Sequence, residues 1–210
     1  MIHDGMSGIA PWQPALHGDT HGVGMNSWTP GLAQLLAWVA TGRSAEAAAL
    51  IAAMHEPLRA RVPALPALAT AEPYARAVIH ADSQGEILLM HWRSAAVSAI
   101  HDHGDAAGLV VALEGEFVEQ TVQLFATGTK VSGKRTMQAG HVERLDVAQG
   151  DYHIMYAPRG GISLHIYTPT PRVMRVVDPE QRKIWIVGEG HGAWLPVDPA
   201  LVKGQLPWPA

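Results

Sequence analysis

The sequence has no cysteine among its 210 residues, which excludes disulfide bonds, thiolate zinc sites and a cysteine nucleophile. Charged residues are few, at 16%, and 15 Lys and Arg against 19 Asp and Glu give a formal charge of −4. No basic run marks a nucleic-acid-binding face, and no apolar run is long enough to cross a membrane. The start of the chain, residues 1–5, has no basic-then-apolar signal pattern. We therefore expect a cytoplasmic protein that binds neither nucleic acid nor membrane.

Histidine is plentiful by contrast, with 12 residues, so any metal must be held by nitrogen and oxygen ligands. Glycine and proline together number 36, about 17% of the chain and above the usual share of about 12%. Such frequent turn residues are typical of a β-rich domain.

The first 73 residues predict an arm and a small helical cap. Residues 1–27 show no periodicity. Thr29 and Pro30 form a helix start, an apolar i, i+3, i+4, i+7 pattern follows, and Gly42 ends that helix. Ser44 can cap a second helix, and prolines from Pro57 onward indicate a connector.

From Tyr74 the pattern changes to short β-branched and apolar runs separated by glycine-containing turns. The expected strands are 74–80, 86–93, 97–101, 109–113, 116–125, 142–147, 153–157, 162–168 and 173–177, and we expect one more between residues 185 and 210. Residues 113–116, Leu-Glu-Gly-Glu, look like a hairpin turn. We predict one structural domain of mainly β class, in which residues 74–210 form a sandwich or barrel and residues 1–73 cover it.

Two histidines stand at i and i+2 in Ile100-His101-Asp102-His103-Gly104. In a strand such residues point to the same face, so two imidazoles could bind one metal ion. Taken alone, the pair fits two surface histidines on a strand edge better than a metal site.

The surrounding motifs resemble those of cupin barrels. In their first motif a Glu ligand follows His-x-His, then six residues, then Gly; here Gly108 replaces the Glu while Gly115 keeps the spacing. Gly150-Asp151-Tyr152-His153 is similar to the centre of the second motif, which supplies a third histidine. Three neutral imidazoles suit a divalent transition metal with open positions for substrate.

Several linked segments resemble the cysteine dioxygenase family of cupins. Ser98 to Gly104 is similar to that family's metal motif, with Trp92 at the expected distance before it. Ser163-Leu164-His165-Ile166-Tyr167, followed by Thr168-Pro169, is similar to its Ser-x-His-x-Tyr series. Tyr74-Ala75-Arg76 is similar to the segment whose Arg receives the substrate carboxylate. The resemblance covers residues 74 to 171, about half of the sequence.

The resemblance implies a double-stranded β-helix, or jelly-roll, barrel and a non-haem Fe(II) thiol dioxygenase. It implies His101, His103 and His153 as metal ligands, Arg76 and Tyr74 as substrate contacts, and Ser163, His165 and Tyr167 as a catalytic relay. In the family O2 adds both oxygen atoms to the sulfur of cysteine, giving a sulfinic acid. Without the resemblance, Arg76 could be a surface residue and the relay a polar stripe on a barrel wall. The resemblance also implies a small-molecule thiol and O2 as partners, and we expect a monomer.

Two departures leave the substrate open. Some relatives link a Cys to the relay Tyr, but Gly108 stands at that position, and Ala107 replaces a bulky residue expected near the substrate. The alternatives are the same chemistry on 3-mercaptopropionate or a bulkier thiol, and a metal-binding cupin without turnover. Arg172 and Arg175 are further candidates for a carboxylate contact at the cavity mouth.

Overall fold

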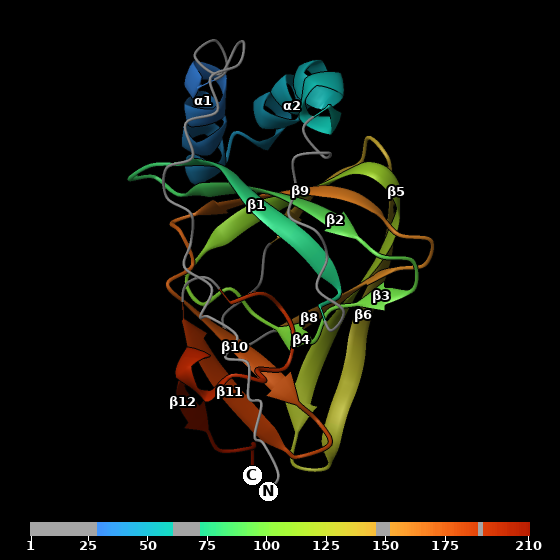
Figure 1. The fold of residues 1–210 in the computed structure, drawn as a ribbon, viewed down its shortest axis with the longest axis vertical. Helices are drawn as coiled ribbons and strands as arrows, with labels where there is room; N and C mark the ends of the chain where they lie inside the picture. Colours follow the sequence, from blue (N-terminus) through green and yellow to red (C-terminus); the bar gives the residue numbers. More distant parts are fainter. Residues whose placement is uncertain (1–28, 61–71, 146–151, 189–190) are drawn as a thin grey trace, which may run out of the picture.

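The computed structural model describes residues 29–60, 72–145, 152–188 and 191–210, which form two helices and a β barrel (Figure 1). The expected arm 1–27 and most of the expected connector lie outside these residues. No helix in the described ranges is long and apolar enough to cross a membrane.

The helical cap consists of α1 (Thr29–Ala40) and α2 (Ser44–Arg59). Leu32, Leu35 and Leu36 of α1 are buried, as their spacing predicts. The prediction for α2 was wrong at both ends. Its N-cap is Arg43 rather than Ser44, and it continues through Pro57 to Arg59. Proline is unfavourable at such a position, because it removes a helix hydrogen bond, and the complete burial of the following Leu58 offsets this cost.

The strands run through the whole second part of the chain, so the predicted mainly β class is confirmed. They are β1 (Tyr74–Ala81), β2 (Glu86–Trp92), β3 (Ala96–Val97), β4 (Ile100–His101), β5 (Ala107–Phe125), β6 (Gly128–Gln138), β7 (Val142–Leu145), β8 (Tyr152–Ala157), β9 (Gly161–Thr168), β10 (Val173–Asp178), β11 (Lys183–Gly188) and β12 (Val202–Leu206).

The strand order β1-β2-β9-β5-β8-β4-β10-β11-β12 closes around an apolar interior. The helices cover the outer face of the β1–β2–β9–β5 sheet (Figure 1), where a leucine- and isoleucine-rich layer buries both surfaces. The inner face of the same sheet carries Tyr74, Met90, Trp92 and Tyr167, which pack in a separate core cluster. Strands β2, β9 and the first part of β5 are thus buried on two sides, and their inward side chains alternate with those under the helices.

Strand β5 contradicts the expected hairpin turn at residues 113–116. The strand continues through this segment without reversing. Its first part pairs with β9, with a bulge between Ala112 and Glu114, and its second part pairs with β8. Gly115 has a φ of +86°, and a Cβ at this position would lie 2.5 Å from the Gly160 carbonyl oxygen. The glycine therefore allows close strand approach and a change of direction rather than a chain reversal.

Candidate metal centre and cavity

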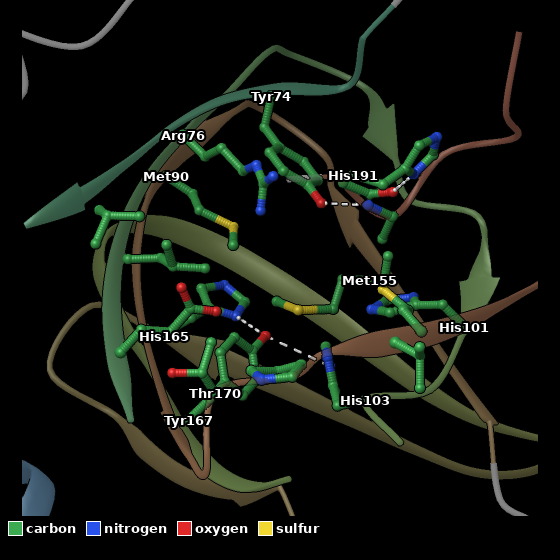
Figure 2. A pocket seen from close by; sticks show the side chains of 18 of the residues that line it. Tyr74, Arg76, Met90, His101, His103, Met155, His165, Tyr167, Thr170 and His191 are labelled. Carbon is green, nitrogen blue, oxygen red and sulfur yellow. Dashed lines mark hydrogen bonds between the residues drawn. The ribbon is translucent and has the colours of Figure 1, made fainter. Parts of the chain in front are cut away.

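A cavity of about 170 Å³ opens on the inner side of the barrel (Figure 2). Arg76 lies on one side of it, and His103 lies on the other. Its walls include three thioethers, those of Met90, Met155 and Met174, which sequence reasoning did not identify.

The structure brings together all three predicted metal ligands. His101 ends β4, His103 lies just beyond that strand, and His153 is in β8 opposite His101. The Nε2 atom of His153 lies 3.0 Å from the Nε2 atoms of both His101 and His103. All three residues are buried and their ligand atoms lie within 4.8 Å of one another, an arrangement that could hold one metal ion.

Hydrogen bonds fix how two of these rings present their nitrogens. The Nδ1–H of His101 donates to the Ala99 carbonyl over 2.9 Å, since a carbonyl can only accept. The Nδ1 of His153 lies 2.6 Å from Oε1 of Glu119, whose carboxylate also pairs with Arg135. Both rings therefore keep the Nε2 lone pair free toward the third histidine, as metal ligands require.

Burial keeps two of the three histidines uncharged. Burial first, and then repulsion between neighbouring imidazoles, lowers the pKa of His101 and of His103 well below the ordinary value. Glu119 is also buried, which by itself raises its pKa, but the hydrogen bonds and charges of His153 and Arg135 outweigh this and lower it. Neutral imidazoles, with an ionised carboxylate bonded to the far nitrogen of His153, fit a divalent cation.

The three predicted relay residues lie on one face of β9 and form a continuous chain of hydrogen bonds. Ser163 Oγ lies 2.9 Å from His165 Nε2, and His165 Nδ1 lies 3.0 Å from the Tyr167 hydroxyl. Figure 2 shows the chain ending at His103, whose Nε2 is 3.4 Å from the same hydroxyl.

Trp92 sets the direction of this chain. Its indole N–H, which can only donate, bonds Ser163 Oγ over 2.8 Å. The buried Ser163 hydroxyl then has His165 Nε2 as the acceptor for its own proton within the described chain. His165 Nδ1–H in turn donates to Tyr167, which leaves the phenol proton to point toward the metal centre.

Both titratable members of the relay hold the neutral form. Burial lowers the pKa of His165 to about 3. Burial also raises the pKa of Tyr167 well above its usual value, and the charges of Tyr74 and Glu86 add to this. The relay therefore presents a neutral phenol donor across the physiological pH range.

The predicted substrate contacts occupy the opposite wall. Arg76 is the one Arg or Lys among the described cavity residues, and it stands beside Met90 in the β1–β2 ladder. The Tyr74 hydroxyl accepts a hydrogen bond from the Ala193 N–H over 2.7 Å, so this side chain also fixes the segment that closes the cavity.

The remaining sequence candidates lie elsewhere. Arg175 pairs with the buried Asp102 instead of reaching the cavity, and Arg172 is exposed. Ala107 is exposed and does not line the cavity, so its expected place near the substrate, where a small residue would widen the pocket, is wrong. Gly108 does lie against the relay: a Cβ there would be 3.0 Å from Tyr167 Cδ1 and 2.5 Å from the Ile166 carbonyl oxygen.

Known structures with a similar fold cover about half of this chain. KdgF from Halomonas sp. is 13% identical over 49% of this chain and 85% of its own, with a TM-score of 0.40. An RmlC-like cupin from Shewanella frigidimarina is 15% identical over 51% and 86%, with a TM-score of 0.41. Hydroquinone 1,2-dioxygenase from Sphingomonas sp. TTNP3 is 16% identical over 48% and 69%, with a TM-score of 0.38.

The family comparison is more specific. The model of the family described as cysteine dioxygenase type I matches residues 48–180, more than half of the chain. This match includes the three converging histidines, Arg76 and the Ser163-His165-Tyr167 relay, and it confirms the cupin barrel expected from the motifs. The chain therefore belongs to the cysteine dioxygenase type I family, and its three-histidine centre fits a metal-dependent dioxygenase of the cupin fold.

Proposed function

We propose that the protein is an iron(II) thiol dioxygenase that converts L-cysteine to cysteine sulfinate with O2. The observation that carries this proposal is the convergence of three imidazole Nε2 atoms beside the Tyr167 hydroxyl, across a cavity from Arg76. One molecule of O2 supplies both oxygen atoms, which form two new bonds to the thiol sulfur.

The donor set suits the proposed metal. His101, His103 and His153 would hold iron(II) through neutral nitrogens, so the ion would keep its full charge toward an anionic thiolate. Iron(II), when bound there, supplies the electron chemistry with O2 that protein side chains lack. The protein's own residues would bind and orient the substrate and hold a proton near the metal.

Arg76 would bind and orient the substrate. A guanidinium forms two parallel hydrogen bonds with a carboxylate, which fixes both the position and the rotation of the bound molecule. Because Arg76 and the histidines lie on opposite walls, a short molecule with a carboxylate at one end and a thiol at the other would span the cavity.

The relay would hold a proton at Tyr167 Oη, next to the histidines. With His165 and Tyr167 both neutral, the phenol donates a hydrogen bond toward the reacting groups and does not remove a proton from them. A polar series that is buried and fully hydrogen-bonded favours an enzyme over the alternative of a passive metal-binding cupin.

Oxygen uptake by the anaerobically Fe(II)-loaded protein tests this function. Cysteine, 3-mercaptopropionate, cysteamine and a bulkier aromatic thiol are supplied in parallel. We expect uptake with cysteine and a product two oxygen atoms heavier. A product from 3-mercaptopropionate alone would make that thiol the substrate in place of cysteine. If protein with stoichiometric iron takes up no oxygen with any thiol, the proposed dioxygenase reaction is rejected, although the metal centre is not.

Substitution of Arg76 tests the orientation of the substrate. The variant Arg76→Ala is expected to raise the KM for cysteine about 10- to 100-fold, which matches the loss of a charged hydrogen bond, and to leave the KM for cysteamine nearly unchanged. Arg172→Ala, at an exposed arginine, is the matched control. Equal increases for both thiols would contradict the assigned contact.

A further inference from the structure

Asp102 separates the two ligands of the His-x-His motif, yet it does not line the cavity. Its side chain is buried, and its Oδ1 accepts hydrogen bonds from the N–H groups of Arg175, over 2.8 Å, and Gly104, over 3.3 Å. Its Oδ2 pairs with the Arg175 guanidinium through both Nε and Nη2. Both carboxylate oxygens of Asp102 are thus hydrogen-bonded within the protein.

The ion pair of Asp102 and Arg175 also contacts the segment that carries the third ligand, His153. Arg175 lies in β10, which is hydrogen-bonded to β4, and its carbonyl accepts the Asp102 N–H over 3.1 Å. Its guanidinium carbon stands 5.3 Å from the ring centre of Tyr152, the residue before His153. One ion pair therefore touches the chain next to all three histidines.

The backbone between His101 and Gly104 leaves the sheet. Strand β4 ends at His101, and Gly104 turns the chain with a φ of +65°. The Asp102 N–H still bonds the Arg175 carbonyl, but the Arg175 N–H bonds the Asp102 carboxylate. A buried ion pair contributes little net stability compared with apolar packing, but it specifies geometry through its directional bonds. The Asp102 side chain thus supplies directional bonds at the point where the strand ends.

We propose that the Asp102–Arg175 pair, stacked on Tyr152, is a positioning device that holds the three histidines at metal-binding separations before the metal arrives. The pair thereby sets the metal affinity of the site. This inference depends on the proposed metal centre and is independent of the substrate.

Metal binding measured apart from catalysis tests this role. The dissociation constant for Fe(II), from anaerobic competition with a chelator, is expected to rise about 10- to 100-fold in Asp102→Asn and in Arg175→Gln, the usual effect of losing a residue that orients metal ligands. The double variant should be no worse than either single one, because both break the same contact. Arg175→Lys should recover part of the affinity, and Arg172→Gln should match the original protein.

Thermal unfolding of each metal-free variant separates affinity from folding, and the visible spectrum of the Co(II)-loaded forms reports the ligand geometry. Folded variants that bind Fe(II) as tightly as the original protein would overturn the proposal, even if their Tm is lower. If Asp102→Asn does not fold, Arg175→Lys decides: intermediate affinity supports the role, and unchanged affinity rejects it. An original protein that binds no Fe(II) would reject the metal centre and the device together.

Discussion

Replacing His153 with alanine is expected to lower Fe(II) affinity by more than about 100-fold and to reduce oxygen uptake to background. His153 is the central member of the cluster, with its Nε2 3.0 Å from both other ligand nitrogens, so its removal leaves two imidazoles from a single segment. Residues that only orient metal ligands already cost about 10- to 100-fold in affinity when lost, and a ligand itself should cost more. Chelator competition and iron content per protein measure the effect.

The matched control is His91→Ala. His91 is an exposed histidine on β2, and its side chain does not line the cavity. Its variant should retain the original iron content, affinity and oxygen uptake. If His153→Ala keeps stoichiometric iron with unchanged affinity, the three histidines do not form the metal centre.

A second consequence of the same substitution concerns Glu119. This carboxylate is buried and is held ionised by His153 and Arg135. When the imidazole is gone, one of these two partners is lost and the buried carboxylate keeps its pairing with Arg135, so the negative charge is less well compensated, which is costly. Some loss of stability in His153→Ala is therefore expected, and iron content must be compared at a temperature where both proteins are folded.

The relay could be predicted from the sequence because its geometry is local. Ser163, His165 and Tyr167 alternate along one strand, so a strand assignment alone places all three on one face. The 3.0 Å contact between His165 and Tyr167 needs only that periodicity and β9 itself. The spacing of His101 and His103 is similarly local, although only His101 lies in a strand.

Glu119 could not be predicted because its role depends on register between distant segments. It lies 34 residues before His153, and the β5–β8 pairing that brings them together follows from the continuation of β5 through Gly115. The hairpin turn expected at residues 113–116 would have reversed the chain and placed Glu119 elsewhere. Glycine in a strand-like context indicates a bulge as well as a turn, and only the partner strand distinguishes the two.

Strand β6 was missed for a different physical reason. Its sequence, Gly-Thr-Lys-Val-Ser-Gly-Lys-Arg-Thr-Met-Gln, has few apolar residues, and it forms the exposed partner of the second half of β5. Hydrophobic alternation is weak where a strand buries little surface. The sequence left the role of Arg175 open, between a carboxylate contact and a solvated strand face, for a related reason. Sequence position gives the strand but not the buried Asp102 that the Arg175 side chain contacts.

The metal-free protein is expected to lose stability steeply as the pH falls from 7 to 5. Burial lowers the pKa of His101, His103 and His165 in the folded state, the last to about 3, whereas an unfolded histidine titrates near about 6.5. Below pH 6.5 the unfolded chain therefore binds protons that the folded chain does not. Stability is fully present above that pH and is lost as the pH falls toward the folded pKa.

The size of the effect makes it measurable by urea unfolding followed by circular dichroism. His165, whose folded-state pKa is about 3, contributes a slope of up to about 1.4 kcal/mol per pH unit below pH 6.5, or about 2 kcal/mol by pH 5. The lowered pKa values of His101 and His103 act in the same direction. A loss of about 2 kcal/mol is already a large part of the stability of a typical domain, about 5–15 kcal/mol. Glu119 does not add to this window, because its pKa is lowered and its contribution is lost only at more acidic pH.

Two variants test which histidines cause the change of unfolding free energy with pH. His165→Gln removes one buried imidazole that is not a proposed ligand, and it should reduce the slope by about one proton, or about 1.4 kcal/mol per pH unit. His91→Ala removes an exposed imidazole and should leave the slope unchanged. A metal-free protein whose stability is flat between pH 7 and 5 would mean that these histidines take up protons in the folded, metal-free state, which would contradict their lowered pKa values.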